Sequence, residues 1–313
     1  MSRWPAVPDD VPTVPPAGTV RLLLLGDSHG ETRMVRRALW VAQHLGATAL
    51  WSVGDFGIWP GGAGRNFLDA CESMAAARAI PIRIVPGNHD DYDQIEAVGY
   101  HDGWAPLREH VWVAERGQVV TVGGCRLLAF GGAASIDGPD GVWPQSRGPG
   151  DGWWPQERIS AADVSRAQAR VAAAGGQVEV AVTHDVPAGV LMSGGDVFGV
   201  GELQRDRIAE AVLPASPQVV VSGHWHRFSR RPLGEATELV VLSADIAPRE
   251  PQYLLLDLHP DRRVDVHIPL PWGQEETLTP ERWLHGRPAA PDTDHDRSRH
   301  RSRVAHPAES LLP

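Results

Sequence analysis

The stretch Leu22–Gly30, LLLLGDSHG, joins four consecutive leucines to a glycine, an aspartate and a histidine. A short apolar run that ends at glycine is typical of a strand buried in the middle of a sheet. The aspartate and the histidine follow directly, at the carboxyl end of that strand, which is the edge where α/β proteins place their sites. The stretch therefore predicts a central strand and the beginning of a functional site.

Two further apolar runs of the same kind come next along the chain. Ala49–Val53 and Ile82–Val85 end at Gly and at Pro-Gly, as buried strands do. Between the first two runs, apolar residues from Met34 to Leu45 recur at a helical spacing, and Asn66–Arg78 is the next predicted helix. This β-α-β-α-β order predicts a layered α/β domain.

The middle and the end of the chain carry further strands, with fewer helices between them. We expect the late strands, which follow one another without helices, to form a second and more antiparallel sheet. The predicted strands are Val111–Val113, Val119–Val122, Arg126–Phe130, Val178–Thr183, Gln218–Val221, Glu238–Leu242, Tyr253–Leu258 and Val264–Ile268, and the predicted helices are Ala161–Ala174 and Leu203–Leu213.

Composition divides the chain into three parts. Residues 1–18 are rich in proline and predict a flexible N-terminus, and residues 19–271 predict one folded domain. Residues 272–313 mix Pro, Arg, His and Asp with few aliphatic side chains, so we expect a disordered tail.

The charge balance restricts the classes of function. The formal net charge is −10 and lysine is absent, so all 29 basic side chains are arginine. This disfavours a protein that coats nucleic acid, and it excludes a P-loop lysine. Cys71 and Cys125 form no CxxC pair, and the chain starts without a signal peptide or a membrane span. We therefore expect a cytoplasmic protein that does not contact membranes.

Polar residues suited to metal binding follow five of the predicted strands. In VSGHWH, residues 221–226, Gly223 permits the backbone turn that lets two histidines one residue apart converge on one point. Imidazole and carboxylate together are a typical ligand set for transition metals. The strand-end residues are Asp27, His29, Asp55, Asn88, His89, His184, His224 and His226.

In chain order these residues spell DxH, GD, GNHD, a single H and GHxH. This set resembles the calcineurin-like metallophosphoesterase superfamily over Leu22–His226, and the loop from residue 131 to residue 155 looks similar to a segment of its bacterial and phage members. The resemblance implies a four-layer α/β/β/α sandwich of two mixed sheets flanked by helices. It also implies a centre of two divalent metals, for which we favour manganese, with iron, zinc and nickel as alternatives.

The resemblance also assigns roles to single residues. It implies that Asp27, His29 and His226 hold one metal, that Asn88, His184 and His224 hold the other, and that Asp55 bridges both. A hydroxide bridging the metals would attack phosphorus in line, and His89 would either be the general acid on the leaving oxygen or stabilise the transition state.

The chain departs from the protein Ser/Thr phosphatase branch of the superfamily. The aspartate that steadies the catalytic histidine there falls at Ile58 here, so His89 needs another orienting group. Asp90, Asp91 and Asp185 are the candidates, and the sequence does not choose among them.

The loop from residue 131 to residue 155 is rich in Gly, Pro and Trp and suggests substrate contacts. An arginine suits a phosphate and indole faces suit a ring, although tryptophans that pack the sheet edge are an equal alternative. The candidate substrate contacts are Trp59, Asp137, Arg147, Trp153 and Trp154.

The sequence thus predicts a dinuclear metal-dependent hydrolase of a small phosphomonoester or phosphodiester. One alternative is a nuclease or DNA-repair phosphodiesterase, which the acidic composition disfavours. The other is a metal-bound scaffold without catalysis that binds a partner protein. The sequence does not indicate the oligomeric state.

Overall fold

Two mixed sheets form the centre of the fold. The computed structural model describes residues 11–138, 149–192 and 200–268. Within this part, the first sheet has seven strands in the order β13-β12-β1-β2-β3-β5-β4, and the second has six in the order β10-β11-β9-β8-β7-β6. The first sheet comprises β1 (Val20–Leu25), β2 (Ala49–Ser52), β3 (Ile82–Ile84), β4 (Trp104–Pro106), β5 (Val111–Ala114), β12 (Tyr253–Leu258) and β13 (Val264–His267). The second comprises β6 (Gln118–Val122), β7 (Cys125–Phe130), β8 (Val180–Thr183), β9 (Val219–Ser222), β10 (Ser229–Leu233) and β11 (Thr237–Val241).

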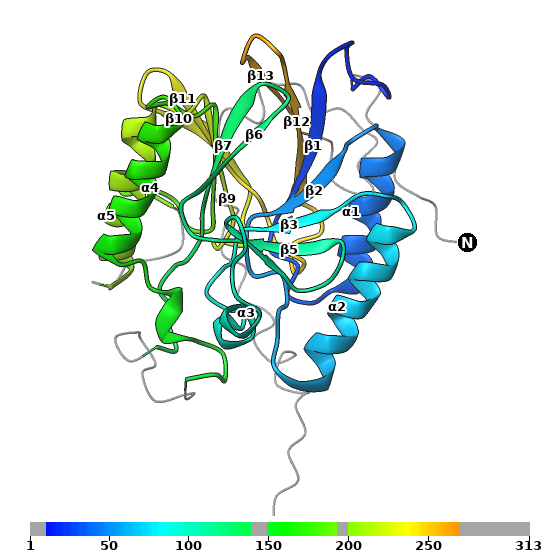
Figure 1. The fold of residues 1–313 in the computed structure, drawn as a ribbon, viewed down its shortest axis with the longest axis vertical. Coiled ribbons are helices and arrows are strands. Elements are labelled where there is room, and N and C mark those ends of the chain that lie inside the picture. The colour runs from blue at the N-terminus through cyan, green and yellow to red at the C-terminus, as the bar shows by residue number, and fades with distance from the viewer. Residues whose placement is uncertain (1–10, 139–148, 193–199, 269–313) are drawn as a thin grey trace, which may run out of the picture. The chain divides into compact units, whose positions relative to one another are not determined.

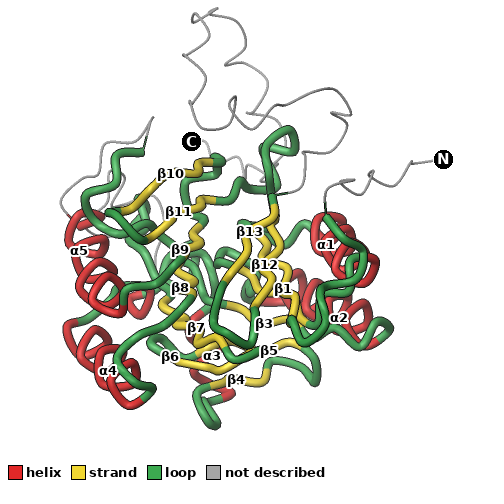
Figure 2. The backbone as a smooth tube through the Cα atoms, turned by 90° about the horizontal axis from the view of Figure 1, so that it is seen from above, coloured by secondary structure: helices red, strands yellow, loops and turns green. Residues whose placement is uncertain are grey.

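Helices cover the outer faces of the two sheets, as Figures 1 and 2 show. Helices α1 and α2 lie on one side of the paired sheets, and α4 and α5 lie on the other. The helices are α1 (Thr32–His44), α2 (Gly61–Ala76), α3 (Tyr92–Val98), α4 (Ala161–Ala173) and α5 (Val200–Val212), with short 3-10 turns at η1 (Pro155–Glu157) and η2 (Leu213–Ala215). No helix within the described ranges is long and apolar enough to cross a membrane.

The run of four leucines in β1 is explained by the layers. Because side chains alternate across a strand, Leu23 and Leu25 pack among the residues under α1 and α2, whereas Leu22 and Leu24 pack between the two sheets. A third apolar cluster lies between the second sheet and helices α4 and α5. Three buried layers of apolar side chains between four layers of structure confirm the predicted α/β/β/α sandwich.

Parallel pairing brings the strand ends together. In the first sheet, β1, β2 and β3 run parallel, and in the second sheet β7, β8, β9 and β11 run parallel. Carboxyl ends of parallel neighbours lie at one edge of a sheet. The segments that follow β1, β2, β3, β8 and β9 are therefore available to build one site.

The prediction for the late strands was correct for β11 and wrong for β12 and β13. Strands β12 and β13 do not join the second sheet, because β12 pairs antiparallel with β1 and β13 pairs with β12. The second sheet is mixed, with antiparallel pairs at its two edges. Three short elements were also not predicted, namely α3, β4 and β10, which have seven, three and five residues and show too little periodicity. The predicted boundaries at residues 18 and 271 stay predictions, since residues 1–10 and 269–313 lie outside the described part.

A buried ion pair joins β1 to β12. Arg21 is fully buried, and its Nε and Nη2 donate to the two carboxylate oxygens of its register partner Asp257 at 2.6 and 2.7 Å. Its Nη1 donates to the carbonyls of Pro12 and Leu45, at 2.5 and 2.9 Å. Burial opposes ionisation of Asp257, but the hydrogen bonds from Arg21 and His267 outweigh it and hold the pKa of Asp257 well below its usual range. The guanidinium thus ties the sheet to the end of α1.

Arg21→Ala should lower the free energy of unfolding by about 3–5 kcal/mol, because the buried Asp257 carboxylate loses both hydrogen bonds from the guanidinium and keeps only the contact with His267. Urea denaturation followed by tryptophan fluorescence measures this loss. The matched control is Arg230→Ala, whose partner Glu238 is 32% exposed, and for which we expect a loss of at most about 1 kcal/mol. Equal losses in the two variants would contradict the role given to Arg21.

Candidate metal centre

The predicted ligands stand just beyond five strands from the two sheets. Asp27 and His29 follow β1, Asp55 follows β2, and Asn88 follows β3. From the second sheet, His184 follows β8, and His224 and His226 follow β9. The two sheets are connected here, because the backbone N–H of His224 donates to Asp27 Oδ2 at 2.9 Å and His184 Nδ1 contacts the carbonyl of Val53 at 3.0 Å.

The structure gathers these residues into two groups that share one carboxylate. In each group the nitrogen and oxygen ligand atoms lie within 4.8 Å of one another. The first group is Asp27, His29, Asp55 and His226, and the second is Asp55, His184 and His224. Asn88 joins the second group, because its Oδ1 lies 3.0 Å from His184 Nε2.

The spacing of the donors fits cations. Two donors that each lie about 2.1 Å from one cation, at angles of about 90–110°, stand about 3.0–3.4 Å apart. The observed N–O separations are 3.5 Å for His29 to Asp55, 3.4 Å for His226 to Asp27 and 3.3 Å for His184 to Asp55. Asp27 Oδ1 and Asp55 Oδ2 are buried without a hydrogen-bond partner. Since a buried carboxylate oxygen is costly to leave unpaired, these two atoms point to ligands that carry positive charge.

The backbone at the site is strained. His29, Asp55, His224 and His226 have φ values of 41°, 46°, 65° and 51°, in the left-handed region that side chains with a Cβ rarely adopt. Such conformations cost about 1–3 kcal/mol each and are typical of functional sites. Gly223 is required as glycine, because a Cβ there would lie 2.0 Å from Asp27 Oδ1.

The electrostatics of the site favour cations. Burial of His184 opposes its protonated form, but the charge of Asp55 and a hydrogen bond to it prevail and raise the pKa of His184 to about 10. Burial likewise opposes protonation of His29, and the hydrogen bond to Asp245 and the nearby carboxylate of Asp55 raise its pKa to about 10. The carboxylates thus create a negative potential that divalent metals would satisfy, with release of the imidazole protons.

Asp245 is a partner of the site that the sequence analysis missed. Its Oδ1 lies 2.8 Å from His29 Nδ1, so the carboxylate orients the ring and leaves Nε2 to face Asp55. Carboxylates in this position commonly support metal-binding histidines. The signal was present, because Asp245 lies four residues beyond the end of β11, which is another strand of the second sheet.

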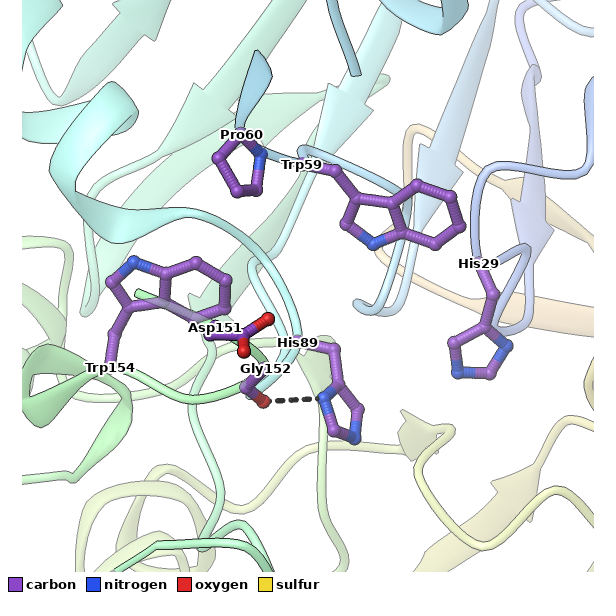
Figure 3. A pocket seen from close by; sticks show the side chains of 7 residues that line it. All are labelled: His29, Trp59, Pro60, His89, Asp151, Gly152 and Trp154. Atoms are coloured by element: carbon purple, nitrogen blue, oxygen red, sulfur yellow. Dashed lines mark hydrogen bonds between the residues drawn. The ribbon is translucent and has the colours of Figure 1, made fainter. Parts of the chain in front are cut away.

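His89 stands beside the two groups and is held by a backbone carbonyl. Its ring centroid lies 6.4 Å from that of His29, and its Nδ1 lies 2.8 Å from the carbonyl oxygen of Gly152 (Figure 3). Because a carbonyl only accepts, Nδ1 carries the hydrogen and Nε2 remains as the atom that can hold or release a proton.

None of the three aspartates considered from the sequence orients His89. Asp90 instead accepts backbone N–H groups, among them those of Gly87 at 2.9 Å and Gly57 at 3.1 Å. Asp91 caps α3 through the N–H of Gln94, and Asp185 accepts from Trp225 Nε1 at 2.8 Å. These carboxylates stabilise the loops of the site. The expectation that one of them orients His89 was wrong, because the carbonyl of Gly152 does so.

A cavity of about 330 Å³ opens beside His29 and His89. Trp59 and Trp154 line it, and in Figure 3 they lie on opposite sides of the space next to His89. The rest of the lining is Pro60, Asp151 and Gly152. Of the other predicted substrate contacts, Trp153 is 9% exposed and, like Asp137, is not part of this lining, and Arg147 lies outside the described residues.

The fold and the sequence are both similar to known proteins. The structure matches a dimetal phosphatase from Danio rerio at 12% identity and a TM-score of 0.52, covering 80% of this chain and 96% of that one. The TT1561 protein of Thermus thermophilus matches at 16% identity and a TM-score of 0.48, covering 80% and 99%. No curated protein matches the chain. The family model described as calcineurin-like phosphoesterase matches residues 20–228, which span all seven predicted metal ligands and His89, and the chain therefore belongs to the calcineurin-like phosphoesterase family.

Proposed function

We propose that this chain is a dinuclear metal-dependent hydrolase that cleaves a small phosphomonoester or phosphodiester. The observation that supports this most is the buried Asp55 carboxylate, which belongs to both groups of candidate ligands and keeps one oxygen unpaired. Two cations about 4 Å apart need an anion between them, and Asp55 supplies one. Family membership and the neighbouring cavity are consistent with this proposal.

The positions of the candidate ligands suggest which of them would bind each metal. Asp27, His29 and His226 would hold one metal, Asn88, His184 and His224 the other, and Asp55 both. When bound, the two dications supply positive charge to the phosphoryl oxygens and lower the pKa of water. The donor set of imidazole, carboxylate and amide suits manganese, and also iron, zinc and nickel.

His89 would donate a proton to the leaving group. The Gly152 carbonyl fixes the ring and its tautomer, so that Nε2 is the only ring atom available for transfer. In this role Nε2 donates its proton to the leaving oxygen as the phosphorus–oxygen bond breaks. His89 sits beside His29 and lines the cavity, which is where such an oxygen would emerge.

The cavity would hold the organic part of the ester. Indole faces at Trp59 and Trp154 favour a flat or apolar group, and a volume of about 330 Å³ suits a small one. We propose a small phosphorylated substrate as the partner, rather than nucleic acid or a membrane, and the cytoplasm as the compartment. The net charge of −10 and two buried free cysteines support this choice.

Metal removal should abolish hydrolysis and Mn²⁺ should restore it, since the cations supply the charge that the reaction needs. The measurement is turnover of p-nitrophenyl phosphate, bis-p-nitrophenyl phosphate, cyclic nucleotides and single-stranded DNA, with Mn²⁺ or with a chelator. Cleavage of DNA alone would replace this proposal with a nuclease. A metal-loaded protein that cleaves nothing would favour a scaffold that binds a partner protein.

His89→Ala should reduce kcat by about 10²-fold or more, because the general acid is lost. Two metals per chain should remain, since the His89 ring bonds to Gly152 and to no ligand group. Turnover and metal content by mass spectrometry measure both effects. The control is His44→Ala, at the exposed end of α1, which should change neither. Wild-type turnover in His89→Ala would remove this residue from the mechanism.

Asp55→Asn should lower metal occupancy below two per chain, because the amide cannot supply the negative charge shared by the two groups. Metal content after loading with excess Mn²⁺ measures the loss, with circular dichroism as the check on folding. Asp69→Asn, at an exposed pair with Arg108, should keep full occupancy. Full occupancy in Asp55→Asn would rule out a shared carboxylate.

A further inference from the structure

The side-chain amide of Asn88 is hydrogen-bonded to Ser135, which is in turn hydrogen-bonded to Glu157. Its Nδ2 donates to Ser135 Oγ at 2.9 Å, and Ser135 Oγ donates to Glu157 Oε2 at 2.9 Å. Asn88, Ser135 and Glu157 are 1%, 5% and 1% exposed, so water does not compete for these bonds. The chain of contacts ends inside the protein, on the side of Asn88 away from His184.

Burial raises the pKa of Glu157 to about 7, and when its carboxyl is ionised the hydrogen bonds between these three side chains run in one direction. Glu157 acts as an acceptor at both oxygens, since the backbone N–H of Ser135 donates to Oε1 at 2.7 Å and that of Trp154 to Oε2 at 3.1 Å. The single hydroxyl hydrogen of Ser135 is therefore used on Glu157, and its oxygen lone pair takes the amide N–H of Asn88. A flipped amide would set two oxygens against each other, so Asn88 Oδ1 must face His184.

The segment from residue 131 to residue 157 is fixed at its two ends by the side chain of Arg116, which is 11% exposed. The guanidinium of Arg116 donates to the carbonyls of Gly131 at 2.8 Å, Gln156 at 2.9 Å and Glu157 at 3.2 Å. The N–H of Gly132 also donates to the carbonyl of Pro86, just before Asn88, at 2.9 Å. Ser135 and Glu157 are thus held in place although 22 residues separate them.

We propose that Ser135 and Glu157 are positioning residues that fix the Asn88 amide with its oxygen toward the second metal, the one also held by His184 and His224. This inference rests on the two-metal site of the proposed function. Metal binding by an amide that is already fixed loses less conformational entropy than binding by a side chain that must first rotate into place. Changes in groups that orient metal ligands commonly weaken metal affinity by about 10–100-fold.

The test is a Mn²⁺ titration of Ser135→Ala and Glu157→Gln, followed by electron paramagnetic resonance. Wild type should pass from a mononuclear signal to the coupled signal of a manganese pair. In both variants the first Mn²⁺ should bind as in wild type, and the coupled signal should need about 10–100-fold more Mn²⁺. Ser135→Ala removes only one oxygen atom, so it decides the matter if Glu157→Gln does not fold.

Two matched controls and one double variant separate positioning from general damage. Ser165→Ala removes an exposed hydroxyl on α4. Glu179→Gln alters another buried carboxylate, which is paired with Arg126. Both control variants should bind two Mn²⁺ as wild type does. In Asn88→Ala, the further change Ser135→Ala should weaken the second Mn²⁺ no more, because the two residues act as one unit. Additive losses would mean a merely structural role.

The titration needs no substrate, so it separates this inference from the proposed function. A wild type that binds a manganese pair but cleaves no ester overturns the hydrolase alone. Wild-type affinity for the second Mn²⁺ in Ser135→Ala overturns the positioning role alone. A wild type that never forms the pair overturns both.

Discussion

The centre depends on a single constraint, which is that the charged carboxylate of Asp55 is buried between ligands from two sheets. Burial opposes its ionisation, but the charges of His184 and His89 hold the pKa of Asp55 well below its ordinary value. A carboxylate that stays charged at 1% exposure must be surrounded by donors or cations. The turn after β2, the glycine before Asn88 and the ends of β8 and β9 all converge to meet this requirement. A Cβ at Gly87, for example, would lie 2.1 Å from Asp55 Oδ1.

This constraint also explains why the sandwich has its two sheets joined at this edge. The negative potential of Asp27 and Asp55 is balanced from the second sheet, whose strands β8 and β9 deliver His184, His224 and His226. Neither sheet alone holds a complete set of donors. His29, Asp55, His224 and His226 keep their strained, positive φ values because the apolar clusters packed against the sheets hold the backbone in place.

Much of this could be predicted from the sequence, because ligands at strand ends are local features. The run before Asp27 predicts a buried strand, and the residues that follow it predict the donors, so the layered α/β fold and the positions of the donors followed from adjacent residues. The four-layer sandwich was implied by the family resemblance. Pairing between distant strands is not local. Nothing in Tyr253–Leu258 indicates that it pairs with β1 rather than with β11, and for that reason β12 and β13 were assigned to the wrong sheet. The partners Ser135 and Glu157 were missed for the same reason, since they meet Asn88 only through a segment that returns from the second sheet.

The group that orients His89 could not be predicted from residue types. At the position where the resemblance places an aspartate in the protein phosphatase branch, this chain has Ile58, which is fully buried and belongs to the apolar cluster under α1 and α2. The same task is done by a backbone carbonyl, that of Gly152, which no side-chain motif can reveal. A carbonyl fixes the ring and the tautomer as a carboxylate does, but it adds no negative charge beside the imidazole. Gly152 and Ser135 both lie between β7 and α4, so this connection contacts a candidate metal ligand, Asn88, and the proposed proton donor, His89.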